Sequence, residues 1–345
     1  MMQKSQTTIK DIARELQISH STVSRALSED QKVSALVAEQ TRKRVQQKAA
    51  ELDYSPNLMA QGFVTGKTGT LGLLTYEIFW ETFARQADQI LKAADKQKYQ
   101  VLMGLATNRR QEFPLENQVT QIRQLISRGI EGLLIHTRGD AEESERIVNA
   151  VSERVPVVTF TSPIKDLSGI VVDMIMSFCE VTEHLIRLGH ERIGFIGTDW
   201  NTDFVGSAKG KGYLLAMKKH GLAPQLIPGR TYPARAIYDL VKRLGDQFTA
   251  LVCRSDYTAI GVCRGLREVG IRVPEDVAVV GYGNLEVAAF VTPPLTTLAT
   301  PYEEIAERAM ELMLEQLEGQ DTPRPPRQIT LQTSLIVRKS CGGRR

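Results

Sequence analysis

The residues best suited to chemistry lie in a short polar stretch near the N-terminus, residues 19–25. Its outward positions carry hydrogen-bond donors and acceptors where an ordinary solvated helix would more often carry Glu and Lys; they are His20, Ser21, Thr22, Ser24 and Arg25. Such side chains can contact the edges of base pairs, and Arg most often forms a paired contact with guanine. The stretch therefore indicates a helix that reads DNA, and a plain helical hairpin is the alternative interpretation.

Two short helices must hold these side chains in place. Thr8 and Asp11 form an N-terminal capping pattern, and the run that follows has the apolar spacing of one helical face, with Ile9, Ile12, Ala13 and Leu16. Residues 17–19 interrupt this pattern, and the second helix would bury Val23, Ala26 and Leu27. Because neither helix buries enough surface alone, the two must pack across each other, which predicts a helix-turn-helix.

A third helix is predicted to close this small core through Val37, Thr41, Val45, Ala49 and Leu52. Its other face carries four cations that could neutralise phosphates, and a solvated charged face explains them equally well; they are Arg42, Lys43, Arg44 and Lys48. Pro56 ends this helix because it disfavours helical geometry at Ser55. Residues 58–64 are too few for a stable isolated helix, and residues 65–69 have the composition of a linker.

From Thr70 onward, apolar runs of strand length alternate with amphipathic stretches of helical length, in one series before Gly169 and a second after it. This alternation predicts two doubly wound α/β lobes with parallel sheets and a ligand cleft between them. The predicted domains are residues 1–57 for DNA binding, 58–69 for hinge helix and linker, and 70–340 for the body. Within the body we expect an N-lobe of about 70–162 and 293–321 and a C-lobe of about 163–292 and 322–340.

The bulk composition excludes several classes of protein. The net charge of +3 does not by itself demand nucleic acid, and the four cysteines form no C-x-x-C pair or metal spacing. We expect a soluble cytoplasmic protein with reduced thiols and no cofactor, because no run approaches the roughly 18 apolar residues of a membrane span and a secretory signal is missing. No common catalytic motif is present, so we expect no enzyme. A doubly wound dehydrogenase or kinase with a helical appendage is the alternative.

The chain resembles the lac repressor (LacI/GalR) family over nearly its whole length. Five blocks in the family's order carry the resemblance: TIKDIARELQISHSTVSRAL, VAEQTRKRVQQKAAELDYSPNLMAQGF, HLIRLGHERIGFIGT, GIRVPEDVAVVGYG and TPPLTTLATPYEEIAERAMELML. The resemblance implies a homodimer that binds a palindromic operator in double-stranded DNA. It also implies a hinge helix in the minor groove and a periplasmic-binding-protein-like body that senses a small, carbohydrate-like effector.

The resemblance assigns DNA-binding roles to individual residues. His20, Ser21 and Arg25 match the major-groove readers. Phe63 matches the position of an apolar wedge that bends the duplex. The remaining implied contacts, including those to phosphates, are Thr8, Ser19, Thr22, Ser24, Ser28, Tyr54, Asn57 and Ala60. The chain departs from the family in carrying about four extra residues near 35–40, and we expect the third helix to begin one turn earlier.

The implied effector site departs further from the family pattern. Positions that usually hold carboxylates have Thr161 and the pair Gly283-Asn284, whereas Lys209 and Arg254 keep positive charge. Cations suit carboxylate or phosphate groups, so we predict a sugar acid or sugar phosphate; alternatively, Arg254 points to solvent or forms an interlobe salt bridge. The predicted effector-binding residues are Tyr76, Phe79, Trp80, Thr161, Lys209, Arg254, Asp256 and Asn284.

The architecture also predicts allostery. Two lobes joined by several crossovers can close about a ligand, and closure would change the spacing of the hinge helices in a dimer. The coupling between effector and operator must be reciprocal in free energy. The tail, SLIVRKSCGGRR, is too short and glycine-rich for an additional heptad helix, so we expect a dimer.

Overall fold

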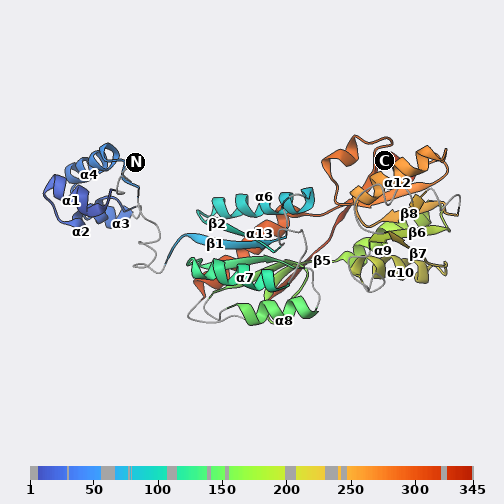
Figure 1. The fold of residues 1–345 in the computed structure, drawn as a ribbon, viewed down its shortest axis with the longest axis horizontal. Helices are drawn as coiled ribbons and strands as arrows, with labels where there is room; N and C mark the ends of the chain where they lie inside the picture. Colours follow the sequence, from blue (N-terminus) through green and yellow to red (C-terminus); the bar gives the residue numbers. More distant parts are fainter. Residues whose placement is uncertain are drawn as a thin grey trace. The chain divides into compact units, whose positions relative to one another are not determined.

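The computed structural model describes residues 7–28, 31–55, 67–76, 78, 80–106, 115–137, 141–151, 155–198, 207–229, 240–241, 247–319 and 325–343. The chain divides into two compact units, residues 1–68 and 69–345 (Figure 1). Each unit has hydrophobic clusters of its own, so each is described separately.

The described residues of the first unit form four helices and no strand, and they contain the predicted helix-turn-helix. Its helices are α1 (Ile9–Leu16), α2 (His20–Ala26), α3 (Gln31–Ser34) and α4 (Glu39–Glu51). The predicted apolar faces form one core, in which Ile12, Val23 and Val45 are fully buried. At the start of α1, the Thr8 backbone N–H donates to Asp11 Oδ2 at 2.9 Å. The core therefore fixes α2 so that its polar residues face outward.

The extra residues do not lengthen the third helix, which corrects that prediction. Helix α4 begins at Glu39, and residues 35–38 lie outside any helix, after the separate turn α3. Val37 reaches the core from this non-helical segment and is only 8% exposed. The extra residues therefore lie in the non-helical segment before α4, and this segment places Val37 in the core.

The second unit contains two six-stranded sheets, one in each lobe. The N-lobe sheet has the order β11-β5-β4-β3-β1-β2 and only parallel pairings; its strands are β1 (Thr70–Thr75), β2 (Gln100–Leu105), β3 (Gly132–His136), β4 (Val157–Thr161), β5 (Ser168–Val172) and β11 (Gln328–Leu331). The C-lobe sheet has the order β12-β10-β9-β8-β6-β7 and is parallel except between β10 and β12; its strands are β6 (Ile193–Thr198), β7 (Gln225–Gly229), β8 (Ala250–Cys253), β9 (Ala278–Tyr282), β10 (Thr296–Ala299) and β12 (Ser334–Ile336).

Helices cover both faces of each sheet, as the doubly wound fold class predicts (Figure 1). In the N-lobe, Leu73 packs with the helices on one face of the sheet, and Leu74 packs with the helices on the opposite face. This explains why the strands are apolar on successive residues. The N-lobe helices are α6 (Glu81–Lys96), α7 (Leu115–Ser127), α8 (Ala141–Ala150) and α13 (Tyr302–Glu318); those of the C-lobe include α9 (Met174–Arg187), α10 (Ala208–Lys219), α12 (Asp256–Glu268) and the short η1 (Glu286–Ala289) and η2 (Lys339–Cys341). Among the described residues, no helix is both long and apolar enough to cross a membrane.

The chain crosses between lobes later than predicted. Strands β5 and β11 belong to the N-lobe sheet and β10 to the C-lobe sheet, so the crossovers follow Val172, Ala299 and Leu331. A short apolar strand has the same sequence pattern in either sheet, and only its pairing decides where it belongs. At Gly169 in β5, a Cβ atom would lie 2.3 Å from Thr159 Oγ1 of β4. Glycine at 169 therefore permits the close pairing that places β5 in the N-lobe.

Candidate DNA-binding surface and effector cleft

The N-terminus of α2 is organised by hydroxyl groups. Ser19 is the N-cap, and its Oγ accepts a hydrogen bond from the Thr22 backbone N–H at 3.1 Å. The same Oγ lies 2.8 Å from the hydroxyls of both Ser21 and Thr22. Capping of this kind satisfies a helix donor that would otherwise lack a partner. Ser19 and Thr22 therefore position α2, whatever else they contact.

The predicted base readers share the exposed side of α2. His20, Ser21, Ser24 and Arg25 are exposed, whereas Val23 and Ala26 are buried beneath them. This arrangement leaves a row of donors and acceptors in the position that a recognition helix needs.

The other predicted DNA contacts have varied surroundings. The Thr8 hydroxyl donates to Asp11 Oδ2 at 2.7 Å, which ties it to the start of α1. Tyr54 packs against the core of the first unit, and burial raises the pKa of its phenol. Ser28 is partly buried. The predicted contacts Asn57, Ala60 and Phe63 lie outside the described residues.

On the basic face of α4, the two lysines pair with glutamates of the same helix. Lys43 Nζ lies 2.9 Å from Glu39 Oε1, and Lys48 Nζ lies 2.6 Å from Glu51 Oε2. Arg44 is exposed on the same helix. The two lysines therefore have acidic neighbours one turn away, as in a solvated helix face, and Arg44 is better placed to contact a phosphate.

In the body, the N-lobe side of the predicted effector cleft is largely aromatic. Tyr76 is only 2% exposed, and its hydroxyl donates to Glu143 Oε1 at 2.6 Å. The centre of its ring lies 5.2 Å from that of the His136 ring. Burial lowers the pKa of His136 to about 3. Tyr76 is therefore part of the lobe interior, which disfavours the predicted stacking on a ligand.

Two further predicted effector-binding residues of the N-lobe are Trp80 and Thr161. Trp80 is partly exposed, and its ring meets that of Tyr257 in the C-lobe edge-on at 5.2 Å. Thr161 ends β4 with a φ of 87°, an unusual value for a residue with a side chain. Phe79 lies outside the described residues.

The C-lobe side of the cleft brings Lys209 and Arg254 together. Lys209 Nζ donates to the Arg254 carbonyl oxygen at 3.1 Å and lies 3.7 Å from the centre of the Tyr282 ring. Burial, followed by the nearby charge of Arg254, lowers the pKa of Lys209 well below its usual value. A buried ammonium is stabilised by an anion, so this position has the electrostatic character of an anion site.

Asp256 differs from its predicted role. Its carboxylate is fully buried and accepts hydrogen bonds from the Leu285 N–H at 2.8 Å and the Thr297 hydroxyl at 2.6 Å. Burial raises the pKa of this carboxyl group. A Cβ at Gly281 would lie 2.2 Å from Asp256 Oδ1, so the adjacent strand needs glycine there. Asp256 therefore anchors the loop after β9 and offers no exposed oxygen to an effector.

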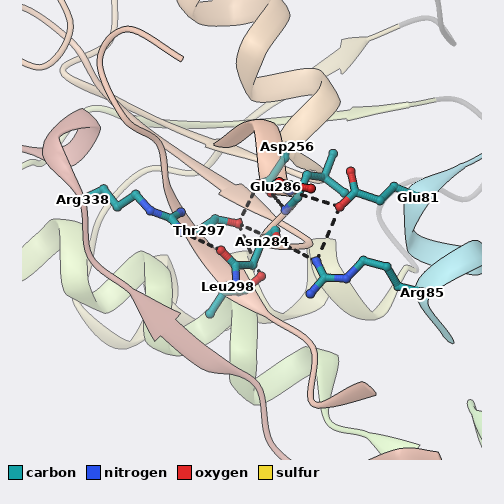
Figure 2. Close-up of polar contacts among 9 residues, drawn as sticks. Glu81, Arg85, Asp256, Asn284, Glu286, Thr297, Leu298 and Arg338 are labelled. Carbon is teal, nitrogen blue, oxygen red and sulfur yellow. Dashed lines mark hydrogen bonds and ion pairs between the residues drawn. The ribbon is translucent and has the colours of Figure 1, made fainter. Parts of the chain in front are cut away.

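Asn284 is likewise engaged within the protein. Its Oδ1 accepts from Arg338 Nη2 at 2.7 Å, and its carbonyl oxygen accepts from Arg85 Nη1 at 2.8 Å (Figure 2). Sequence reasoning missed Arg85 and Arg338, because they lie far along the chain from Asn284 and belong to no recognisable motif. The side chain of Asn284 therefore takes part in loop structure, and its assignment to effector binding stays a prediction.

Comparison with known protein families follows the same division of the chain. The model described as bacterial regulatory proteins of the lacI family matches residues 8–57, which contain the helix-turn-helix. Residues 8–57 are a LacI-family helix-turn-helix domain. The model for a periplasmic binding protein-like domain matches residues 182–341, so the resemblance seen in the sequence is confirmed in both units.

Curated relatives that the chain matches over nearly their full length are transcriptional regulators. The repressor CytR of Escherichia coli K12 is 29% identical, and the match covers 98% of this chain and 97% of CytR. The repressor PurR of Aliivibrio fischeri ES114 is 28% identical, and the match covers 98% of this chain and 99% of PurR. The chain is therefore a helix-turn-helix transcriptional regulator by relationship as well as by architecture.

Solved structures agree with the fold of the body and the first unit. The lac repressor dimer bound to operator and the anti-inducer ONPF aligns with a TM-score of 0.85 over 98% of this chain and 99% of that one, at 22% identity. The regulator CelR in complex with cellobiose aligns with a TM-score of 0.66 at 25% identity, over 97% of this chain and all of CelR.

Proposed function

We propose that this regulator binds a palindromic operator as a homodimer and that each α2 reads one half-site. The exposed row of polar residues on α2 carries this proposal, because its side chains have the chemistry of base recognition and a buried core holds them outward. The hinge, residues 58–69, would enter the minor groove with Phe63 as its apolar wedge. The protein would act in the cytoplasm as a repressor and not as an enzyme.

Selection from a random double-stranded DNA library tests this proposal directly. We expect the full-length protein to enrich a palindrome and Arg25→Ala to weaken binding by about 1–3 kcal/mol while relaxing specificity at one base pair of each half-site. Arg14→Ala, which removes an exposed arginine of α1 that pairs with Asp11, is the charge-matched control and should keep the base preference. Enrichment of no sequence, or an unchanged preference in Arg25→Ala, would contradict the proposal.

Exposed apolar side chains support the dimer. On the N-lobe, β2 is an edge strand, and Leu102, Met103 and Leu105 are each more than a third exposed. On the C-lobe, Phe290 is 79% exposed and Val287 43% exposed. Exposed apolar side chains, and an exposed sheet edge in particular, favour association. A second copy of the chain would cover these side chains on both lobes. Phe290→Glu should shift the protein toward monomer in sedimentation analysis.

Among the ligands considered, we favour an anionic carbohydrate-like effector bound between the lobes. Lys209 supports this assignment, because an anion would stabilise its charged form and Arg254 lies beside it. Melting shifts measured with gluconate, glucose 6-phosphate and neutral glucose test the ligand class. We expect a shift with an acid or phosphate that Lys209→Met removes, and a response to glucose alone would contradict the assignment.

A further inference from the structure

Two charged side chains of the N-lobe helix α6 reach across to the C-lobe. Arg85 Nη1 donates to the Asn284 carbonyl oxygen at 2.8 Å, and Glu81 Oε1 accepts from the Glu286 backbone N–H at 3.1 Å. The two side chains also face each other, with 3.6 Å between Arg85 Nη1 and Glu81 Oε1. Figure 2 shows this closed ring of contacts between one helix and one loop.

The C-lobe side of this contact is held by hydrogen bonds within its own lobe. The loop is held from beneath by Asp256, which accepts from the Leu285 N–H, and by Thr297, which bonds to Asp256. Arg338 holds it from the side, since its guanidinium donates both to Asn284 Oδ1 and to the Leu295 carbonyl oxygen at 2.7 Å. The loop therefore presents a fixed carbonyl and a fixed N–H to α6.

The N-lobe side is suited to reversible contact. The side chains of Arg85 and Glu81 are 41% and 31% exposed, so water can replace either partner when the contact opens. Ion pairs that are this exposed contribute little individually. Such contacts can favour one arrangement of the lobes without making it permanent.

We propose that Glu81 and Arg85 form a latch between the lobes and that its opening or closing sets operator affinity. This inference rests on the proposed function, because it assumes that lobe arrangement controls DNA binding. A contact of this kind stabilises one of two arrangements of the lobes, so its loss changes the populations of the two arrangements.

The segment 254–256 at the start of α12 connects the loop of the latch to the candidate effector site. Lys209 donates to the Arg254 carbonyl oxygen, and Arg254 immediately precedes the Ser255 cap and Asp256 at the start of α12. An anion that draws Lys209 away from that carbonyl would disturb the segment from which Asp256 holds Leu285. Ligand binding and the latch therefore act on one short stretch of structure.

Arg85→Ala and Glu81→Ala test the latch in the full-length protein. Glu81→Ala is needed because Arg85 also lies over the Tyr302 ring. Lys92→Ala is the control, since Lys92 is on the same helix and pairs only with the exposed Asp88 among the contacts described. The measurements are amide hydrogen exchange of the segment 284–286 and affinity for an operator recovered from a random DNA library.

Both latch variants should raise exchange in this segment and change operator affinity by about fivefold or more, as typical couplings do. Lys92→Ala should change neither. The latch is refuted if exchange stays at the wild-type rate, or if exchange rises while operator affinity stays within about twofold. Failure of the wild-type protein to enrich any DNA sequence would instead refute the proposed function, because exchange is measured without DNA.

Discussion

The surface of α2 and the loop after β9 both carry polar residues that the sequence marked as binding residues, yet their surroundings are opposite. On α2, Arg25 and Ser24 are exposed over a buried apolar layer. In the loop, Asn284 is bonded to two arginines, and Asp256, which holds the loop from the start of α12, is fully buried. Polar residues that the family resemblance assigns to binding are therefore exposed in one region and hydrogen-bonded within the protein in the other.

The difference has a physical origin. A recognition side chain must keep unused hydrogen-bonding capacity facing its partner, whereas a buried polar side chain is stable only when its capacity is used internally. Asp256 accepts two hydrogen bonds inside the protein. Substitutions in the two regions should consequently affect different quantities, stability in one and DNA binding in the other.

The largest expected effect is at Asp256. Asp256→Ala leaves the Leu285 N–H and the Thr297 hydroxyl without their acceptor, and we expect the free energy of unfolding to fall by about 3 kcal/mol. Urea unfolding of the body measures this loss. Asp88→Ala, which removes an exposed carboxylate on α6, is the control and should be nearly neutral. A stable Asp256→Ala protein that has lost only effector binding would reverse the comparison.

The next effect concerns pH and the buried His136. Burial lowers its folded pKa to about 3, below the usual value of about 6.5. The unfolded chain therefore binds the proton more readily, so this contribution to stability is present above about pH 6.5 and is lost as the pH falls toward 3. Between pH 7 and 5 we expect the wild type to lose about 2 kcal/mol more than His136→Phe in urea unfolding. Equal losses would show that another group controls acid stability.

Local patterns in the sequence predicted most of the fold. The spacing from Ile9 to Leu27 predicted α1 and α2, and the alternation after Thr70 predicted the two lobes, because these features depend on short-range periodicity. The membership of β5, β10 and β11 in one sheet or the other was not predictable in this way. It depends on pairing between residues far apart in the chain, such as Ile329 of β11 with Ile170 of β5.

The site was less predictable for the same reason. Lys209 and Arg254 follow strands of the C-lobe sheet, and Lys209 Nζ donates to the Arg254 backbone carbonyl oxygen, but their predicted role toward an effector stays a prediction. The engagement of Asn284 by Arg85 and Arg338 depends on partners 199 and 54 residues away. No local pattern specifies such contacts, and so the sequence could not distinguish a ligand-binding polar residue from a structural one.

A smaller effect separates the two roles assigned to Ser19. Ser19→Ala removes the cap of α2 and should destabilise the first unit by about 1 kcal/mol, seen as faster hydrogen exchange in residues 20–26. Ser19→Asp restores a capping oxygen but places a negative charge where the family resemblance implies a phosphate. We expect it to recover the exchange protection and still bind DNA more weakly. Full recovery of DNA binding would leave Ser19 with the capping role alone.

The smallest effect tests the basic face of α4. Lys43 and its partner Glu39 are 74% and 68% exposed, and an ion pair this exposed adds almost nothing to stability. Lys43→Ala should therefore leave unfolding unchanged, and it should leave the salt dependence of DNA binding unchanged because Glu39 already offsets its charge. Arg44→Ala should lower the slope of log affinity against log salt by about 0.9, the value for one phosphate contact. If Lys43→Ala lowers the slope as much as Arg44→Ala, the whole basic face contacts DNA and the recognition surface extends from α2 onto α4.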